Sequence, residues 1–332
     1  MSPPEPPQRL ADLVGWTPFQ IVPQPDNILI NWFHLQGATF DEPFFGQTIE
    51  KRLQDPARQV ITTPISALAE VAGLVESRTP GAFIFHCARA GSTLLANAFR
   101  ALPGNIVLAE PPPINQLMSA PHRYLAAGPW PDWLRDMMRC LSQPLRPDDR
   151  RSIVKFNSLS ALEGALIAQV FPQVPCLFLY RHPLEVMVSA LKAPPIWMKL
   201  RKDPENAAQC LALPSTALRD ASPEEFAGQA LKRIFETAAA EEHWHVLNYE
   251  DLTPENLPAI AALLDLPYGS EAEAALAAVF QQDAKSTDET TFAADAARKR
   301  AAASPAVQAA CATYLEEAYR ALERRRARFS RP

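Results

Sequence analysis

Glycine and cysteine are both scarce in this chain of 332 residues, which has 11 glycines and five cysteines. The cysteines are odd in number, scattered and without a Cys-x-x-Cys pair, which argues against a disulfide framework and against a structural zinc site. The first residues, MSPPEPPQRL, show no basic segment followed by an apolar one, so no secretory signal is predicted. No apolar run reaches about 18 residues, so no membrane span is expected. The expected location is therefore the cytoplasm.

An excess of positive charge is also missing. The chain has 32 Lys and Arg residues against 37 Asp and Glu residues, for a net charge of -5. Proteins that bind nucleic acids or membrane surfaces are usually basic, so neither partner is expected. The hydrophobic fraction of 48% and the charged fraction of 21% are typical of a globular protein with a sizeable core. Proline is plentiful, with 33 residues, and its clusters predict irregular connections.

The pattern of apolar residues changes near residue 81. We interpret residues 1–80, which mix aromatic residues with short helical stretches such as 65–75, as a cap segment. In residues 81–332, short and fully apolar runs alternate with amphipathic stretches, which predicts an α/β domain with a central parallel sheet and helices on both faces. The expected strands are 82–85, 106–109, 153–156, 176–180 and 244–247, and the expected helices are 92–102, 159–170, 184–191 and 222–242.

Parallel sheets of this kind bind ligands beyond the carboxyl ends of their strands. After the first expected strand, the segment HCARAGSTLLANAF forms a loop of small residues that runs into a helix. Small side chains let an anion approach the backbone, and the amide groups of a helix N-terminus attract phosphate. The alternative is an ordinary strand-to-helix turn, and the Gly-Lys-Ser/Thr of a Walker A loop is absent. The residues expected to bind an anion here are Arg89, Ala90, Gly91, Ser92 and Thr93.

A second candidate anion site follows the fourth expected strand, in RHPLEVMVSAL. Arg181 stands at the end of the strand, and Ser189 lies eight residues later, inside the next helix. These two residues meet at one anion if the strand, turn and helix fold back on each other. The alternative makes Arg181 a partner in a surface ion pair and Ser189 a small residue at a helix contact.

The two segments together resemble the motifs of the nucleotide-dependent sulfotransferases. CARAGST is similar to the family's loop for the 5'-phosphosulfate of the donor, 3'-phosphoadenosine 5'-phosphosulfate (PAPS), and RHPLEVMVSAL is similar to its 3'-phosphate motif. A third segment, HVLNYEDL, resembles the family segment whose tyrosine lies by the adenine, which here is Tyr249. The resemblance covers roughly residues 81–254. It implies a P-loop NTPase-like fold, PAPS as donor, no metal, and an acceptor hydroxyl on a small molecule, a sugar or a peptide.

Two more residues at strand ends fit this resemblance. Glu110 lies nineteen residues after Gly91, a spacing similar to that of the protein-tyrosine sulfotransferases, where a glutamate at this place acts as base. Lys155 lies on the third expected strand, where family members often have a lysine near the transferring group. Asn157 replaces the histidine that small-molecule members use as a base, which favours Glu110. The alternative makes Glu110 a cap for the proline-rich turn.

The chemistry of sulfuryl transfer assigns further roles. Arg89 and Lys155 are expected to stabilise the charge that grows on the leaving phosphate. For Glu110 to act as a base, apolar surroundings are expected to raise its pKa. Two histidines near the start of the fifth expected strand, His243 and His245, are kept as alternative bases.

The late part of the chain contains one more candidate contact for the nucleotide. A polar and basic segment, 284–300, resembles the family's late loop that closes over the nucleotide, which makes Lys285 a candidate nucleotide contact; the alternative is a solvated loop.

One rival function is a P-loop kinase or another NTP-dependent phosphotransferase. The other is a nucleotide-binding protein without catalytic activity. The sequence does not identify the acceptor or the oligomeric state.

Overall fold

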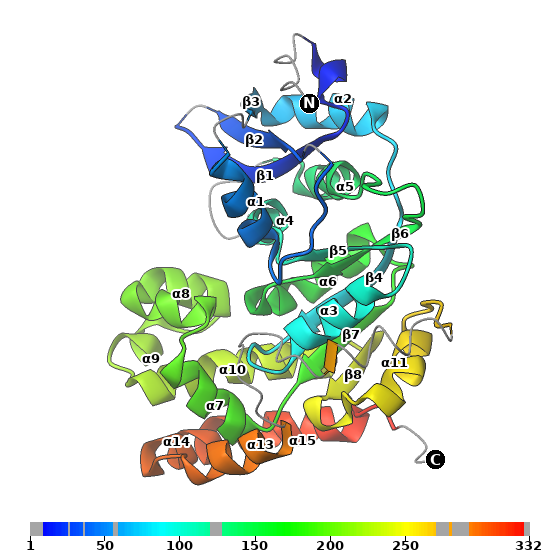
Figure 1. The fold of residues 1–332 in the computed structure, drawn as a ribbon. Coiled ribbons are helices and arrows are strands. Elements are labelled where there is room, and N and C mark those ends of the chain that lie inside the picture. Colours follow the sequence, from blue (N-terminus) through cyan, green and yellow to red (C-terminus); the bar gives the residue numbers. More distant parts are fainter. Residues whose placement is uncertain are drawn as a thin grey trace.

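A five-stranded parallel sheet and a smaller antiparallel sheet organise the chain (Figure 1). This computed structural model describes residues 9–25, 27–35, 37–55, 59–119, 128–269, 279–280 and 292–328. The N-terminal part contains η1 (Leu10–Leu13), β1 (Trp16–Pro23), β2 (Ile28–His34), α1 (Phe45–Leu53), β3 (Val60–Pro64), η2 (Ile65–Ala67) and α2 (Leu68–Leu74).

The rest of the chain alternates strands with helices. Its strands are β4 (Pro80–His86), β5 (Asn105–Ala109), β6 (Arg151–Lys155), β7 (Cys176–Tyr180) and β8 (Trp244–Asn248). Its helices and helical turns are α3 (Ser92–Ala101), α4 (Pro112–Met118), α5 (Trp130–Leu141), η4 (Ser158–Glu163), α6 (Gly164–Val170), α7 (Pro183–Lys192), η5 (Ile196–Lys202), α8 (Pro204–Leu211), α9 (Ser215–Arg219), α10 (Pro223–Ala240), η6 (Tyr249–Asp251), η7 (Pro254–Asn256), α11 (Leu257–Leu263), α13 (Phe292–Ala301), α14 (Pro305–Ala310), η8 (Cys311–Leu315) and α15 (Glu316–Arg325).

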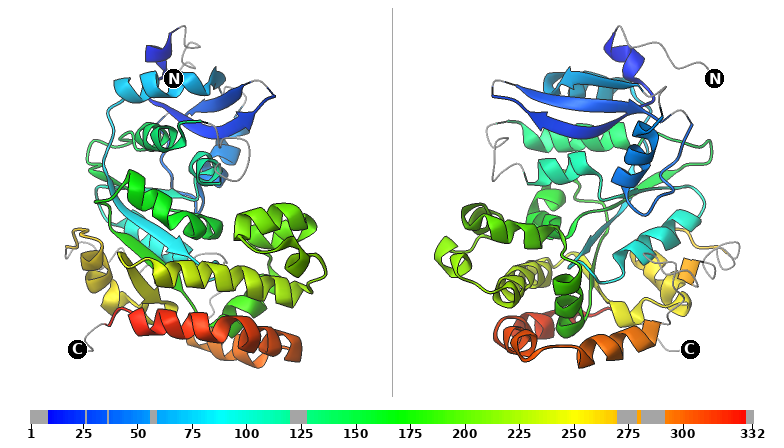
Figure 2. Two further views of the ribbon diagram at one scale, coloured as in Figure 1. Left: turned by 180° about the vertical axis from the view of Figure 1, so that it is seen from behind. Right: turned by 60° about the vertical axis from the view of Figure 1, so that its left-hand side comes forward.

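The large sheet has the strand order β5-β6-β4-β7-β8, and every neighbouring pair is parallel. The chain therefore winds in one direction from β4 to β5 and in the opposite direction from β6 to β7. Since such crossovers are right-handed, the connecting helices α3 and α6 lie on opposite faces of the sheet. Figures 1 and 2 show α3 on one face, with α6 and α10 on the other. This arrangement confirms the predicted α/β fold with a P-loop-like parallel sheet.

The strand predictions are confirmed because the strands are largely apolar and are covered on both faces. Every residue of β5 and β7 is buried, as expected for a parallel sheet covered by helices. Four of the five predicted helices coincide with α3, α7, α10 and the pair η2 and α2, and the fifth, 159–170, divides into η4 and α6. Asn157 sets the start of η4, because its side chain accepts a hydrogen bond from the Ser160 amide at 3.0 Å and so caps this helical turn.

The three-stranded sheet β1-β2-β3 was not anticipated from the sequence, which indicated only short helical stretches here. Its strands are antiparallel, and β1 packs on α4 and α5 (Figure 2). Two glutamine side chains satisfy backbone groups of the β1 region: Gln116 binds both the amide and the carbonyl of Ile21, at 2.9 and 2.7 Å. Gln143 accepts a hydrogen bond from the Gly15 amide and donates one to the Trp16 carbonyl, at 2.8 Å each.

One cluster of buried apolar side chains runs through both parts of the molecule. It contains Trp16 and Trp32 of the small sheet as well as Phe85 and Phe178 of the large one. The division at residue 80 therefore stays a prediction about organisation, while the packing is continuous. Within the described ranges, no helix is both long and apolar enough to cross a membrane.

Candidate active site

The loop between β4 and α3 has an unusual backbone. Ala88, Arg89 and Gly91 all adopt left-handed conformations, with φ angles of 68°, 54° and 83°. For the two residues with a Cβ atom, this conformation is strained and persists only where the surroundings enforce it. Left-handed residues turn successive N–H groups toward one side and so form a concave anion site at the start of a helix.

Tyr249 lies directly against this loop. A Cβ atom added to Gly91 would lie 2.7 Å from ring atoms Cδ2 and Cε2 of Tyr249, closer than real Cβ contacts allow. Glycine at position 91 is therefore required twice, by its φ angle and by the tyrosine ring. The first and third sequence motifs meet here, although about 160 residues separate them.

The first turn of α3 carries buried hydroxyl groups. Ser92 is 3% exposed and Thr93 is 1% exposed. Among the residues that the structure describes, none is a hydrogen-bond partner for the Thr93 Oγ1 atom, although a buried hydroxyl without a partner is costly. A hydroxyl placed in this way, at a helix N-terminus and next to a concave loop, fits the binding of a phosphate group.

The two arginines of the predicted anion sites face one region. The Nε atom of Arg89 donates a hydrogen bond to Oγ of Ser189 at 2.7 Å. The guanidinium of Arg181 lies 4.1 Å from the centre of the Tyr249 ring, a cation–π contact. Arg181 is only 4% exposed, so its alternative reading as a surface residue is wrong. Both cations therefore lie on the same edge of the sheet as Gly91.

Glu185 holds Arg181 in place, and sequence reasoning missed it. Its Oε2 atom lies 2.5 Å from Nε of Arg181, and its Oε1 atom lies 2.7 Å from Nε of Arg300 on α13. This carboxylate therefore bridges the two guanidinium groups, and Arg300 also pairs with Glu250 at 3.0 Å. The spacing of four residues between Arg181, just before α7, and Glu185, in its first turn, was the available signal.

Glu110, Lys155 and His86 form a second cluster beside the loop. Nζ of Lys155 lies 2.5 Å from Oε1 of Glu110, and Nε2 of His86 lies 3.6 Å from the same oxygen. The Lys155 side chain is 1% exposed and that of Glu110 is 27% exposed. Glu110 also has a left-handed backbone, with φ 56°, which holds it at the end of β5.

The structure corrects the expected pKa of Glu110. Burial raises the pKa of this carboxyl, but the Lys155 ammonium and a hydrogen bond from His86 outweigh burial and lower it to about 2. Burial lowers the pKa of Lys155, against the opposing effect of Glu110. Burial is the largest single effect on this carboxyl, but Lys155 and His86 together outweigh it, so the pKa falls instead of rising.

His86 contacts both the anion loop and Glu110. Its Nδ1 accepts a hydrogen bond from the Ala88 amide at 2.9 Å, so the proton is carried on Nε2. Nε2 then donates to the Phe156 carbonyl, at 3.0 Å, and faces Glu110. Through these contacts His86 links the anion loop to the carboxylate.

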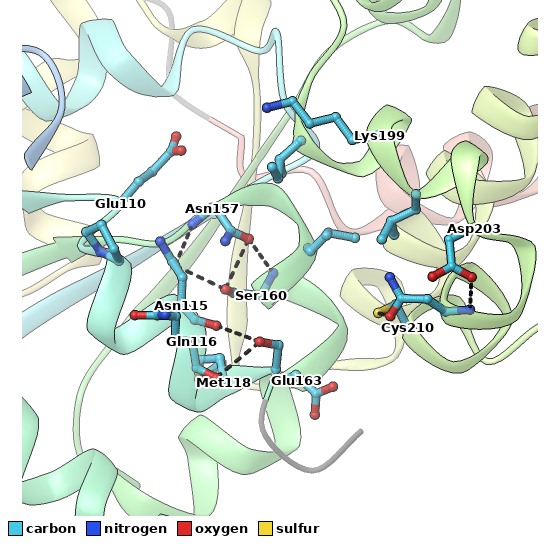
Figure 3. A pocket seen from close by; sticks show the side chains of 16 residues that line it. Glu110, Asn115, Gln116, Met118, Asn157, Ser160, Glu163, Lys199, Asp203 and Cys210 are labelled. Atoms are coloured by element: carbon cyan, nitrogen blue, oxygen red, sulfur yellow. Dashed lines mark hydrogen bonds between the residues drawn. The ribbon is translucent and has the colours of Figure 1, made fainter. Parts of the chain in front are cut away.

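A cavity of about 640 Å³ opens beside Glu110 (Figure 3). Its walls come from α4, η4, η5 and α8, and Figure 3 shows Glu110 and Asn157 across from Asp203 and Cys210. Polar and apolar side chains both contribute. Besides Glu110, it is lined by Pro112, Asn115, Gln116, Met118, Ser119, Asn157, Leu159, Ser160, Glu163, Ile196, Lys199, Leu200, Asp203, Asn206 and Cys210.

The remaining sequence candidates lie elsewhere. His243 and His245 lie at the amino end of β8, whereas Tyr249 follows its carboxyl end, so the two histidines are at the wrong edge of the sheet. Lys285 is outside the described residues. In the part of the chain that the structure describes, no group of three or more His, Cys, Asp or Glu side chains is arranged to hold a metal ion.

No protein-family model matches the chain, and no curated protein matches it in sequence. Several solved structures are similar to it. The sulfotransferase domain from the curacin biosynthetic pathway is 16% identical over 71% of this chain and 98% of that one, with a TM-score of 0.41. Sulfotransferase STF1 from Mycobacterium tuberculosis H37Rv is 16% identical over 75% and 83%, with a TM-score of 0.39. Mouse sulfotransferase SULT7A1, complexed with PAP, is 13% identical over 77% and 86%, with a TM-score of 0.34. These values are too low to assign an activity, which must come from the geometry of the site.

Proposed function

We propose that the protein is a sulfotransferase that moves the sulfuryl group of PAPS to an acceptor hydroxyl. One observation carries this proposal: Arg89, Ser189, Arg181 and Tyr249 converge beside a left-handed loop at a helix N-terminus. Two cations so close together fit a ligand that bears phosphate at two positions. The missing Gly-Lys-Ser/Thr leaves the kinase alternative without a specific observation in its favour.

In this proposal the donor lies across the carboxyl edge of the sheet. The backbone of residues 88–91, with the hydroxyls of Ser92 and Thr93, holds the 5'-phosphosulfate. Arg181 and Ser189 hold the 3'-phosphate, and Arg89 lies between the two groups because it already contacts Ser189. Tyr249, placed against both Gly91 and Arg181, borders the adenine. The desolvated arginine pocket selects this nucleotide over ATP, since ATP would leave the pocket unfilled.

The transfer step uses the second cluster. The acceptor oxygen forms a bond to sulfur while the bond from sulfur to the bridging phosphate oxygen breaks, and the electron pair leaves with the phosphate. Lys155 stabilises the charge that grows on that oxygen. Glu110 takes the acceptor proton. A bound donor competes for the Lys155 ammonium and so weakens its hold on Glu110, which raises the pKa of the carboxyl toward a useful value.

The cavity beside Glu110 is the proposed acceptor site. Its volume of about 640 Å³ lies in the range of small-molecule sites. Amide side chains such as Asn115 and Asn157 supply hydrogen-bonding groups, while Met118 and Leu200 supply apolar surface. This mixture suits a hydroxyl-bearing small molecule, a sugar or the end of a side chain.

Thermal unfolding with the desulfated nucleotide, 3'-phosphoadenosine 5'-phosphate (PAP), tests the donor site. We expect PAP at about 100 times its Kd to stabilise the parent by about 2.7 kcal/mol, and ATP with magnesium to have little effect. The variants Arg89→Ala and Arg181→Ala should lose this gain. Arg219→Ala is the control, because this residue and its partner Glu205 are both well exposed. A response of the two site variants equal to the parent would refute the assignment.

The variant Glu110→Gln tests the base. Turnover of PAPS should fall by about 10² to 10⁴, the usual range for a general base, while PAP still stabilises the protein. Because the single change leaves the buried Lys155 without its partner, the double variant Glu110→Gln and Lys155→Met serves as a second test of folding. Retained turnover in Glu110→Gln would remove Glu110 from the mechanism, and turnover absent from the parent would favour a non-catalytic nucleotide-binding protein.

A further inference from the structure

An aromatic ring from the N-terminal part covers the reacting cluster. The Nζ atom of Lys155 lies 4.7 Å from the centre of the Phe44 ring. Phe44 lies in the connection between β2 and α1, the dark blue segment that descends toward the end of β5 in Figure 1. No motif of the sequence indicated that this segment reaches the site.

The turn that carries Phe44 is anchored on both sides. Phe40 and Phe45 are buried, and their rings stack with centres 4.7 Å apart. Glu42 pairs with Lys51 of α1 at 2.7 Å. Asp41 pairs with Arg146, before β6, at 3.3 Å, which fastens the turn to the α/β part. The position of the Phe44 ring is therefore set by the surrounding structure.

The Lys155 ammonium has a limited set of neighbours. Glu110 accepts a hydrogen bond from one of its three N–H groups. The side chain is only 1% exposed, so the other two N–H groups have little access to water. Arg100 of α3 acts on Lys155 with charge of the same sign and lowers its pKa further. A ring face attracts an ammonium electrostatically, and the attraction strengthens when water is excluded. Phe44 thus supplies stabilisation at the point where Lys155 has few polar partners.

We propose that Phe44 is a positioning residue for the transfer step. Its ring holds the Lys155 ammonium against Glu110 and keeps water from it, so the N-terminal part completes the reacting cluster rather than only covering the sheet. This inference rests on the proposed function for its kinetic consequence. Because Phe44 acts through Lys155, we expect it to affect kcat and to leave donor affinity and the KM of the acceptor unchanged.

Kinetics of three variants test this role. Phe44→Leu keeps an apolar side chain but removes the ring face, and we expect kcat to fall about tenfold. Phe44→Trp keeps a ring and should restore kcat to within about threefold of the parent. Phe19→Leu is the control, because Phe19 packs on Phe33 within the small sheet. Equal kcat in Phe44→Leu and the parent, or a loss of kcat that tryptophan does not rescue, would overturn the proposal.

A chemical measurement tests the contact without enzyme activity. Acetic anhydride modifies accessible, uncharged lysines, and mass spectrometry can follow the labelling of Lys155 in the full chain. We expect Lys155 to be labelled at least about tenfold faster in Phe44→Ala than in the parent, with Phe44→Trp near the parent rate. Equal labelling in all three proteins would refute the shielding role. If the parent turns over no PAPS while labelling behaves as expected, the proposed function fails and the contact stands.

Discussion

At the scale of single residues, Gly91 shows how one position joins two distant parts of the site. Its left-handed φ of 83° shapes the anion loop, and its missing Cβ makes room for Tyr249. Gly37 has nearly the same φ, 82°, but nothing lies within 4 Å of the place where its Cβ would be. The two glycines therefore separate the cost of backbone strain from the cost of a steric clash.

The first prediction uses this pair. Gly37→Ala should lower the free energy of unfolding by about 1 kcal/mol through strain alone and leave PAP affinity unchanged. Gly91→Ala should cost about 2 to 4 kcal/mol, because the new methyl group also displaces the Tyr249 ring, and should weaken PAP binding more than tenfold. Urea unfolding and a PAP titration measure both effects. Equal losses in the two variants would show that the ring moves aside without cost.

At the scale of elements, the C-terminal helix fastens the segment that carries Tyr249. Arg326, at the end of α15, binds both carboxylate oxygens of Asp251, at 2.6 and 2.8 Å. Glu323 accepts hydrogen bonds from Tyr180 at 2.6 Å and from Asn248 at 2.7 Å, which ties the helix to the carboxyl ends of β7 and β8. The end of the chain thereby determines where η6 lies.

We therefore expect Arg326→Ala to destabilise the protein by about 1 to 2 kcal/mol and to weaken PAP binding, since η6 loses its charged anchor. Arg320→Ala, on the same helix, is the matched control. Arg320 pairs with Glu316 where both side chains are more than half exposed, so its loss should cost less than about 0.5 kcal/mol. Urea unfolding of the two variants gives the comparison. Similar losses would mean that the Asp251 contact contributes nothing special.

The sequence predicted elements well where one local pattern decides the outcome. The apolar runs of β4 to β8 favour a buried parallel sheet, and Asn157 and His182 cap the helical segments that follow them. The small sheet escaped prediction because β1, WTPFQIVP, contains two prolines and a register irregularity between Pro18 and Gln20.

The site was predicted less completely, for a physical reason. Residues at strand ends follow from the topology, so the positions of Arg89 and Arg181 were accessible. The contacts that decide charge were not: Lys155 meets Glu110 across 45 residues and Phe44 across 111. Such pairings depend on tertiary packing. Because they were not predicted, the pKa of Glu110 was expected to be raised, whereas in the structure it is lowered.

At the scale of the whole molecule, the shared core predicts a single unfolding unit. Buried side chains of the small sheet belong to the same cluster as those of the large one, and Gln116 and Gln143 bond the β1 region to α4 and the end of α5. Hydrogen exchange measured by mass spectrometry should therefore give β1 and β2 the same free energy of opening as β4 and β7. Opening of the small sheet at a free energy several kcal/mol lower would show two independent units.

The fastening of the two arginines has a consequence for how a ligand arrives. Arg89 is already bonded to Ser189, and Arg181 is already held between Glu185 and Tyr249. Side chains that are ordered beforehand lose little conformational freedom when they bind, so affinity is not diminished by their immobilisation. Association should then be governed by diffusion and electrostatic attraction, and its rate should fall steeply as salt is added.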